Sequence, residues 1–321
     1  MKFTTLDDGT PDGRLHLVSR DLARIQPADG VVALQALLEA WDTHAPALEQ
    51  QYAALNAGGG TPFDVGRALA PLPRAWQWLD GSAYQSHGEL MAKVFGKKAE
   101  TEASRPLMYQ GISDHFLAPT QDVPLPSEDD GIDFEGEFGI ICDEVPMGTT
   151  ADAARGHIRL LVQINDWSLR AIAPLEMVTG FGWVQCKPAC SMAPVAVTPD
   201  ELGAQWRDAR IDLPLLVDWN GERFGAARGY EMGFGFDQLI AHAARTRRLV
   251  AGTIIGSGTV SNPDFREVGS SCIAERRGIE MLDLGGAKTG FMRFGDRVRM
   301  ECIGADGVSV FGAIDQTVVK A

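Results

Sequence analysis

The stretch DFEGEFGII at residues 133–141 places three carboxylates at alternate positions, with apolar residues between and after them. Because successive side chains of a strand point to opposite faces, Glu135 and Glu137 would emerge side by side, with Phe138 on the other face. Two interpretations fit this stretch taken alone. Either the polar face of a strand is exposed to water, or the carboxylates hold a divalent cation, which prefers clustered oxygen ligands and cancels their repulsion.

The composition indicates a folded globular protein and argues against polyanionic partners. The 321 residues are 45% hydrophobic and 22% charged, which suffices for one large domain or two. With 29 basic and 43 acidic side chains, the formal net charge of −14 disfavours nucleic acid and anionic membranes as partners. The first residues lack the apolar segment of a signal peptide, and no apolar run is long enough for a membrane helix. We expect a cytoplasmic protein.

Two other classes of site are not indicated. The five cysteines are scattered, as expected of reduced structural thiols. Cys186 and Cys190 flank Lys187, but no second Cys or His pair completes a zinc site. GGAKTG at 285–290 lacks the glycine directly before the lysine that a phosphate-binding loop requires, so no nucleotide cofactor is predicted.

Residues 1–75 are predicted to form a small N-terminal α+β domain. Two short strands are expected around the Gly/Pro turn within 2–19, followed by an amphipathic helical stretch over 31–55 that ends at glycines 58–60. The Pro-containing segment 63–78 is typical of an extended linker into the second domain, residues 76–321.

Strand patterns dominate the second domain, and an Asn-Gly pair at 220–221 predicts a two-residue hairpin. The predicted strands lie within 106–110, 133–138, 158–165, 193–197, 213–226, 252–260 and 297–314. Helices are expected after Tyr84, after Asp166, and from Asp237, which is interpreted as a helix N-cap. Because strands and helices do not alternate regularly, a β-rich α+β fold is favoured over a doubly wound parallel sheet.

Further polar residues follow or precede the predicted strands. Asp166 ends the apolar run RLLVQI, where it could complete a carboxylate cluster or cap a helix. Asp80, Tyr84 and His87 lie within a short span upstream, although a lone histidine is more often structural than catalytic. Thr259 and Glu275 lie around a Gly-rich loop downstream.

Taken together, these blocks resemble the fumarylacetoacetate hydrolase family, and the fumarylacetoacetases in particular, in their order along the chain. The matching blocks are D-x-x-x-Y-x-x-H (80–87), D-F-E-G-E (133–137), N-D-W-S-x-R (165–170), Lys187, and G-T-V-S (258–261) followed by Glu275. The resemblance covers residues ~76 to 305. It implies a mixed β-roll or β-sandwich of the fumarylacetoacetase C-terminal type and a homodimer.

The resemblance also implies a metal site. Glu135, Glu137 and Asp166 match the family's metal-binding carboxylates, and Asp80 is the fourth expected ligand. Mg²⁺ is the expected ion, with Ca²⁺ or Mn²⁺ as alternatives. The acidic strand face is therefore interpreted as a cation site.

Catalytic and substrate-binding roles follow from the same resemblance. His87 matches the catalytic histidine and Glu275 the carboxylate paired with it, while Arg170 and Lys187 match the cations that face the oxyanion. The expected substrate contacts are Tyr84, Tyr109 and Thr259.

The chain departs from the fumarylacetoacetase pattern at several positions. Ala173 replaces a glutamine, Lys97 and Lys98 stand where an arginine holds the distal carboxylate of the substrate, and the loop before Glu275 is two residues longer. We expect a metal-dependent hydrolase that cleaves a carbon–carbon bond in a small anionic acylpyruvate or β-diketo acid. The alternatives are an isomerase, decarboxylase or lyase of 2-oxo acids, or a non-catalytic binding protein.

Overall fold

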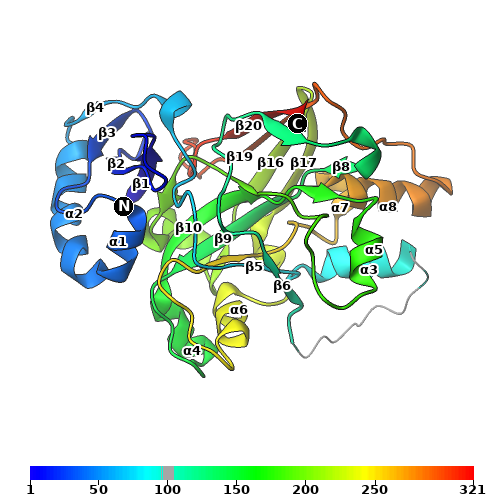
Figure 1. Ribbon diagram of the computed structural model, residues 1–321, viewed down its shortest axis with the longest axis horizontal. Coiled ribbons are helices and arrows are strands. Elements are labelled where there is room, and N and C mark those ends of the chain that lie inside the picture. The colour runs from blue at the N-terminus through cyan, green and yellow to red at the C-terminus, as the bar shows by residue number, and fades with distance from the viewer. Residues whose placement is uncertain (95, 97–104) are drawn as a thin grey trace.

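Two β-sheets dominate the computed structural model, which describes residues 1–94, 96 and 105–321 (Figure 1). Eleven strands of the described chain form the larger sheet, and β12 (Ser191–Met192) pairs with β10 beside the main strand order. That order is β4 (Thr61–Pro62), β3 (Arg24–Pro27), β2 (Arg14–Val18), β1 (Lys2–Leu6), β13 (Ala196–Val197), β10 (Ile158–Asn165), β9 (Gly136–Cys142), β18 (Ile254–Gly256), β5 (Trp78–Gly81) and β6 (Met108–Gly111).

The second sheet packs against the first through aromatic and aliphatic side chains. Its five strands, in order, are β17 (Glu222–Arg228), β16 (Pro214–Trp219), β19 (Arg297–Cys302), β20 (Ile314–Lys320) and β7 (Val123–Leu125). Phe138 of β9 contacts Phe311 at a ring-centroid distance of 6.1 Å. Two short pairs complete the strands of the described chain, β8 (Ile132–Asp133) with β11 (Ser168–Leu169) and β14 (Trp206–Arg207) with β15 (Arg210–Ile211). The predicted β-rich α+β fold is confirmed.

Strand β9 is buried along its whole length because both of its faces pack against protein. It pairs antiparallel with β10, where Ile140 lies opposite Leu161, and with β18, where Ile140 lies opposite Ile255. Phe138 and Ile140 belong to one hydrophobic cluster, and Ile141 belongs to a second cluster on the other face. Each fully buried side chain of this size contributes about 1.5–3 kcal/mol to folding, so the run GEFGIIC anchors the sheet.

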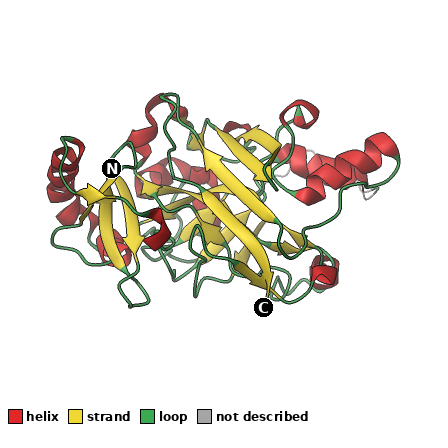
Figure 2. Cartoon of the chain, turned by 90° about the horizontal axis from the view of Figure 1, so that it is seen from above, coloured by secondary structure: helices red, strands yellow, loops and turns green. Residues whose placement is uncertain are grey.

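The N-terminal strands continue the large sheet. Strand β1 pairs antiparallel with β13, with Phe3 opposite Ala196. The helices α1 (Leu34–Glu39) and α2 (Trp41–Asn56) pack against one face of these strands (Figures 1 and 2). The predicted helical stretch is thus two helices, because Ala40 between them has non-helical backbone angles.

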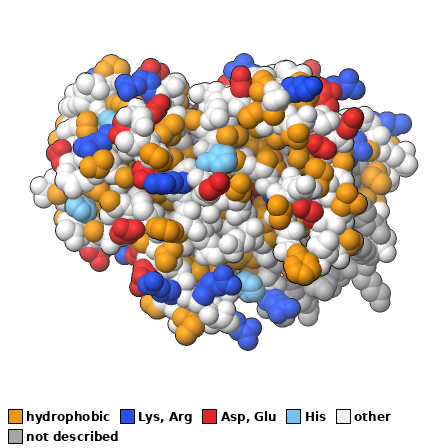
Figure 3. All heavy atoms as spheres, in the orientation of Figure 1, with side chains coloured by type: hydrophobic (Ala, Val, Ile, Leu, Met, Phe, Trp, Pro, Cys, Tyr) orange, Lys and Arg blue, Asp and Glu red, His pale blue; other side chains and the backbone are white. Residues whose placement is uncertain are grey.

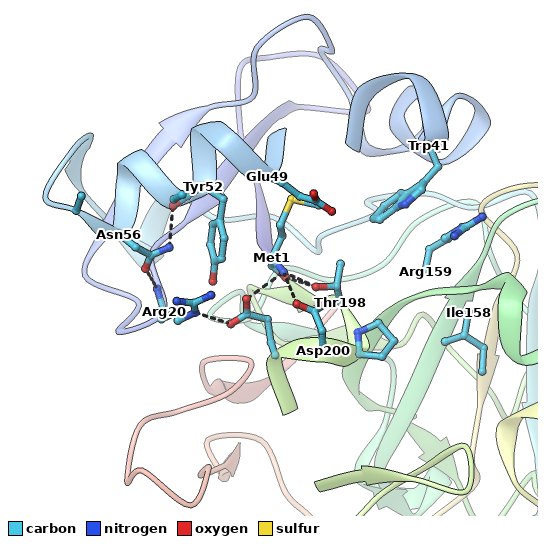
Figure 4. A pocket seen from close by; sticks show the side chains of 14 residues that line it. Met1, Arg20, Trp41, Glu49, Tyr52, Asn56, Ile158, Arg159, Thr198 and Asp200 are labelled. Carbon is cyan, nitrogen blue, oxygen red and sulfur yellow. Dashed lines mark hydrogen bonds and ion pairs between the residues drawn. The ribbon is translucent and has the colours of Figure 1, made fainter. Parts of the chain in front are cut away.

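A cavity of about 640 Å³ lies between α2 and the segment that follows β13 (Figure 4). Arg20 stacks on the Tyr52 ring at 5.4 Å and pairs with Glu201 at 3.3 Å. The Met1 amino nitrogen lies 3.1 Å from the Glu201 carboxylate. These contacts join the N-terminal strands and helices to the main sheet, and no residue singled out by sequence lines this cavity.

The described part of the chain contains six further α-helices outside the N-terminal region, and the 3₁₀ turns are short. These helices are α3 (Gln85–Val94), α4 (Ala151–Ala154), α5 (Ala173–Met177), α6 (Phe236–Ala243), α7 (Phe265–Val268) and α8 (Ile273–Leu284). The 3₁₀ turns are η1 (Val65–Arg67), η2 (Glu128–Asp130), η3 (Arg155–His157), η4 (Pro199–Gln205) and η5 (Gly229–Glu231). None of the described helices has the length and apolar character needed to cross a lipid bilayer.

Two details of the predicted helices are wrong. Asp237 does not cap α6, because Gly235 is the N-cap and Asp237 instead accepts a 2.7 Å bond from Nε of Arg155. Helix α8 was not predicted, and Glu275, expected around a Gly-rich loop, lies in its first turn. The sequence before α8 has Cys272 at the N-cap, which is not among the usual capping residues.

The predicted Asn-Gly hairpin is confirmed. Asn220 and Gly221 join β16 to β17 and both have positive φ, 51° and 83°. A two-residue turn with two left-handed residues matches the twist of the flanking strands.

Candidate active site

Three buried carboxylates converge at the centre of the large sheet. Asp80 lies on β5, Glu137 on β9, and Asp166 directly after β10. One oxygen from each lies within 4.8 Å of the other two. Neither oxygen of Glu137 has a hydrogen-bond partner among the described residues, and its side chain is 0% exposed. A buried carboxylate without donors is destabilising unless a positive charge compensates it, so this cluster fits a divalent cation.

Burial and mutual repulsion favour the protonated forms of Asp80 and Glu137 when no cation is bound. Burial, reinforced by the neighbouring Asp166, raises the pKa of Asp80 to about 8. Burial, together with Asp80 and Asp166, raises the pKa of Glu137 well above its usual range. Protons and a cation would therefore compete for the same oxygens.

Two glycines make room for Asp80. Gly256 on β18 lies between β5 and β9, and a Cβ there would overlap Oδ1 of Asp80 and the ring of Trp78. Gly258 has φ +77° and its N–H donates a 3.0 Å bond to the same Oδ1. The glycines of G-S-G-T thus let the Asp80 carboxylate approach the sheet centre.

Asp166 accepts three donors from side chains. Tyr109 on β6 donates its hydroxyl at 2.6 Å and Lys187 its ammonium at 2.5 Å, both to Oδ2. The thiol of Cys190 donates at 3.0 Å to Oδ1. Burial and the Asp166 charge raise the pKa of Tyr109 well above its usual range, so this hydroxyl keeps its proton and remains a donor.

Glu135 lies beside this cluster and is paired with both predicted cations. Its Oε2 accepts a 3.0 Å bond from Lys187, and its Oε1 accepts from Nη2 of Arg170. Burial alone would raise the pKa of Glu135, but Lys187 and Arg170 outweigh burial and lower it. The structure therefore groups Asp80 with Glu137 and Asp166, whereas Glu135 contacts the two cations next to them.

His87 and Glu275 meet across two packed helices at the edge of the site. Nδ1 of His87, on α3, lies 2.8 Å from Oε2 of Glu275, on α8. The Glu275 side chain is 0% exposed and that of His87 is 21% exposed. The pair thus has one buried member and one that reaches the surface of the site.

The family assignment follows from two matches that together span most of the chain. The family model for the fumarylacetoacetate hydrolase C-terminal domain matches residues 77–319, and that for the fumarylacetoacetase N-terminal domain 2 matches residues 1–74. The chain belongs to the fumarylacetoacetate hydrolase family. The family predicted from the sequence blocks is thereby confirmed.

Individual relatives of this fumarylacetoacetate hydrolase family protein are distant. A 2,4-didehydro-3-deoxy-L-rhamnonate hydrolase from Sphingomonas is 28% identical over 159 residues, 49% of this chain and 53% of the relative. A fumarylacetoacetase from Caenorhabditis elegans is 24% identical over 263 residues, 73% of this chain and 60% of the relative. The alignments thus span about half to three fifths of these relatives.

Solved structures share the fold over the full length of the chain. A maleylpyruvate hydrolase from Sphingobium, in complex with manganese(II) and pyruvate, superposes with a TM-score of 0.67 at 18% identity, covering 100% of both chains. A 5-carboxymethyl-2-hydroxymuconate delta-isomerase from Mycobacterium smegmatis gives 0.63 at 16% identity, covering 100% of this chain and 99% of the other. The fold therefore occurs in both hydrolases and isomerases.

The remaining predicted residues occupy different surroundings in this family member. The Tyr84 hydroxyl is buried and donates a 2.9 Å bond to the Gly229 carbonyl, and Thr259 is buried directly after Gly258. Ala173 begins α5. Lys97 and Lys98 lie outside the described residues.

Three residues at the site had no role assigned from sequence. Asp133 accepts a 2.8 Å bond from Nε of Arg170, Cys190 binds Asp166, and Gly256 makes room for Asp80. Asp133 belongs to the alternating acidic stretch, and this was the one available signal for it. Cys190 and Gly256 give no signal by spacing, because their partners are distant in the chain.

Two positively charged side chains of the site lie in its interior. On the face drawn in Figure 3, acidic and basic side chains are interspersed. Lys187 and Arg170 are both largely buried, and neighbouring carboxylates raise the pKa of each despite the opposing effect of burial. Both side chains therefore stay positively charged.

Proposed function

We propose that this protein is a divalent-metal-dependent hydrolase that cleaves a carbon–carbon bond in an acylpyruvate or β-diketo acid of the fumarylacetoacetate type. The observation that carries the proposal is the buried Asp80–Glu137–Asp166 cluster at the centre of the large sheet, with its unpartnered Glu137 oxygens, together with the His87–Glu275 pair. The hydrolases among the relatives and solved neighbours support the same reaction class.

Asp80, Glu137 and Asp166 would hold the cation, with Glu135 beside them. When bound, the cation would supply Lewis acidity toward the oxygens of the substrate. Mg²⁺ is the proposed ion because the ligand atoms are all carboxylate oxygens, and Mn²⁺ or Ca²⁺ would fit the same donors.

His87 would act as the general base. Because Glu275 is a buried acceptor 2.8 Å from Nδ1, that nitrogen carries the proton and Nε2 keeps a lone pair for a water proton. The water oxygen bonds to the carbonyl carbon, and the bond from that carbon to the neighbouring methylene carbon then breaks. The leaving carbon takes the electron pair and the proton from His87.

Lys187 and Arg170 would stabilise the oxyanion of the tetrahedral state. An ammonium has three N–H donors, and Lys187 uses two of them on Glu135 and Asp166. The third has no acceptor among the described residues and would bind the oxyanion, a contact whose loss costs about 3 kcal/mol in comparable sites. Tyr109, whose ring centroid lies 5.4 Å from the Lys187 ammonium nitrogen and whose ring is edge-on to Trp183, would line the substrate side.

An isomerase, decarboxylase or lyase of a 2-oxo acid is the second candidate. The solved delta-isomerase with the same fold favours it. The His87–Glu275 pair favours hydrolysis, because isomerisation needs a single base and no activated water.

A substrate panel separates these reactions. The purified protein with Mg²⁺ is incubated with acylpyruvates, fumarylacetoacetate and 2-oxo acids, while loss of enol absorbance is followed and products are identified by mass spectrometry in ¹⁸O-water. Hydrolysis yields two acids with one ¹⁸O in the newly formed carboxylate. Rearranged product of unchanged mass, or release of CO₂, would reject the hydrolase in favour of the second candidate.

Three further features remain proposals. We propose a homodimer, which light scattering in solution would test. The boundary of the two domains near residue 75 and the cytoplasmic location are proposed on the sequence patterns described above. A monomer at working concentrations would reject the proposed dimer.

A further inference from the structure

The carboxylate of Asp133 is fully buried. Its two oxygens accept hydrogen bonds from two different parts of the site. Its Oδ1 accepts a 2.7 Å bond from the backbone N–H of Ile273, and its Oδ2 accepts a 2.9 Å bond from that of Ala274. The same Oδ2 accepts a 2.8 Å bond from Nε of Arg170. One side chain on β8 thus binds both a helix start and a side chain that pairs with Glu135.

The helix side of this contact leads directly to the proposed base. Ile273 and Ala274 are the first two residues of α8, and their N–H groups have no partner within the helix. Glu275 is the next residue. Its N–H donates to the Cys272 sulfur at 3.3 Å, and its carboxylate binds His87. An anion at a helix N-terminus is stabilised by the free N–H groups and the helix dipole. Asp133 therefore accepts from the first two N–H groups of α8, directly before Glu275.

The arginine side leads to the proposed oxyanion cations. Nε of Arg170 binds Asp133 and Nη2 binds Glu135, so carboxylates hold two nitrogens of the planar guanidinium. Glu135 in turn binds Lys187 at 3.0 Å. Without the Asp133 charge, Arg170 would be held through Nη2 only and could rotate about its side-chain bonds.

We propose that Asp133 is a positioning residue that holds Arg170 and the His87–Glu275 pair in a fixed relative arrangement. This inference rests on the proposed function, because it assigns a purpose to the arrangement of the same base and cations. Asp133 touches neither His87 nor the Asp80–Glu137–Asp166 cluster by any hydrogen bond of the described residues, so it acts through Glu275 and Arg170.

The substitution Asp133→Asn tests the proposal with little change in shape. An amide can accept from Ile273, but its NH₂ group would face two further donors, Ala274 N–H and Arg170 Nε–H. Asp129→Asn, at an exposed position of the preceding turn, is the matched control. If Asp133→Asn does not fold, Ile273→Pro is measured in its place, because proline fits the first helical position after the extended Cys272 and lacks the N–H that bonds Oδ1 of Asp133.

Two readouts separate positioning from mere stabilisation. The first is the Nδ1–H signal of His87 in ¹⁵N-histidine-labelled protein without substrate, identified by its absence in His87→Gln. We expect Asp133→Asn to shift or broaden it, with Asp129→Asn unchanged. The second is kinetic: kcat should fall about 10²-fold with KM nearly constant, as expected when reacting groups are misplaced. Mn²⁺ binding measured by paramagnetic resonance should stay within about threefold of the unmodified protein.

The outcomes distinguish this proposal from the proposed function. A folded Asp133 variant with an unchanged His87 signal and unchanged kcat overturns the positioning role while the hydrolase stands. Loss of Mn²⁺ binding in Asp133→Asn also overturns it, because the residue would then act on the cation site. A shifted His87 signal in a protein that hydrolyses none of the panel supports the positioning role and rejects the hydrolase.

Discussion

His87 and Glu275 are separated by 188 positions in the chain, yet Nδ1 of the histidine lies 2.8 Å from Oε2 of the glutamate. Helices α3 and α8 pack against each other and bring the two side chains together, with Gly278 of α8 next to Val94 of α3. The Glu275 carboxylate is buried and the His87 imidazole faces the site, as required of a base whose ring is oriented by a second residue.

Replacement of His87 by glutamine should abolish hydrolysis and leave the cation site intact. We expect kcat to fall by about 10²- to 10⁴-fold, because glutamine accepts no proton at neutral pH. Glu275→Gln should have a smaller effect in the same direction, since the ring would lose its charged partner. Rates are measured by enol absorbance and metal content by elemental analysis. Normal turnover by His87→Gln would rule out its role as base.

Replacement of Glu137 by glutamine should remove the cation. The amide has half the oxygens of the carboxylate and no charge, so the three-residue cluster would lose its central ligand. Binding of Mn²⁺, followed by paramagnetic resonance, should weaken by at least about 10²-fold. Glu222→Gln, at an exposed position on β17, is the control and should bind normally. Unchanged Mn²⁺ affinity in Glu137→Gln would exclude this carboxylate as a ligand.

Replacement of Gly256 by alanine should disturb the cation site through Asp80. The new methyl group would overlap Oδ1 of Asp80 and the Trp78 ring, both fixed in a buried strand. Overpacking of this kind costs about 1–3 kcal/mol of stability, and the displaced carboxylate should weaken Mn²⁺ binding as well. Gly286→Ala, where a methyl group meets no atom within 4 Å, should change neither thermal unfolding nor binding. Equal thermal unfolding and equal Mn²⁺ binding of the two variants would contradict the close approach of β18 to Asp80.

The stabilisation gained from a divalent cation should increase with pH. Burial raises the folded-state pKa of Asp80 to about 8, above an unfolded value near 4, so between these values the cation-free folded state binds more protons than the unfolded state. Its stability therefore falls as pH rises through that window. A cation replaces the protons, so the rise in Tm on adding Mg²⁺ should be larger at about pH 8.5 than at about pH 6.

The pH experiment has an internal control. Differential scanning fluorimetry of Glu137→Gln, with Mg²⁺ or with a chelator, should show a much smaller cation-induced rise at both pH values. A Mg²⁺ effect that is equal at both pH values in the unmodified protein would show that proton release from the cluster does not accompany cation binding.

Much of the site could be predicted because its residues lie in local patterns. The alternating acidic stretch at 133–141, Asp166 at the end of an apolar run, and the Asp80–His87 spacing are each visible within a few residues. Local patterns also predict a β-rich fold and the hairpin at Asn220, since strand alternation and turn chemistry depend on neighbours in the chain. Helix α8 escaped prediction because part of its N-terminal capping comes from Asp133, 140 residues earlier.

By itself, the sequence determined the family, the β-rich α+β class and the residue types available for cation binding and acid–base chemistry, because these depend on the kind and order of side chains. The tertiary structure alone decided which partners each of those side chains has. Three alternate carboxylates of one stretch have three sets of partners: Asp133 binds α8 and Arg170, Glu135 binds Arg170 and Lys187, and Glu137 joins Asp80 and Asp166. The reason is strand order. Strand β18 places β5 near β9, and the glycine at 256 lets the carboxylates of these two strands meet. No local spacing in the sequence encodes this long-range arrangement.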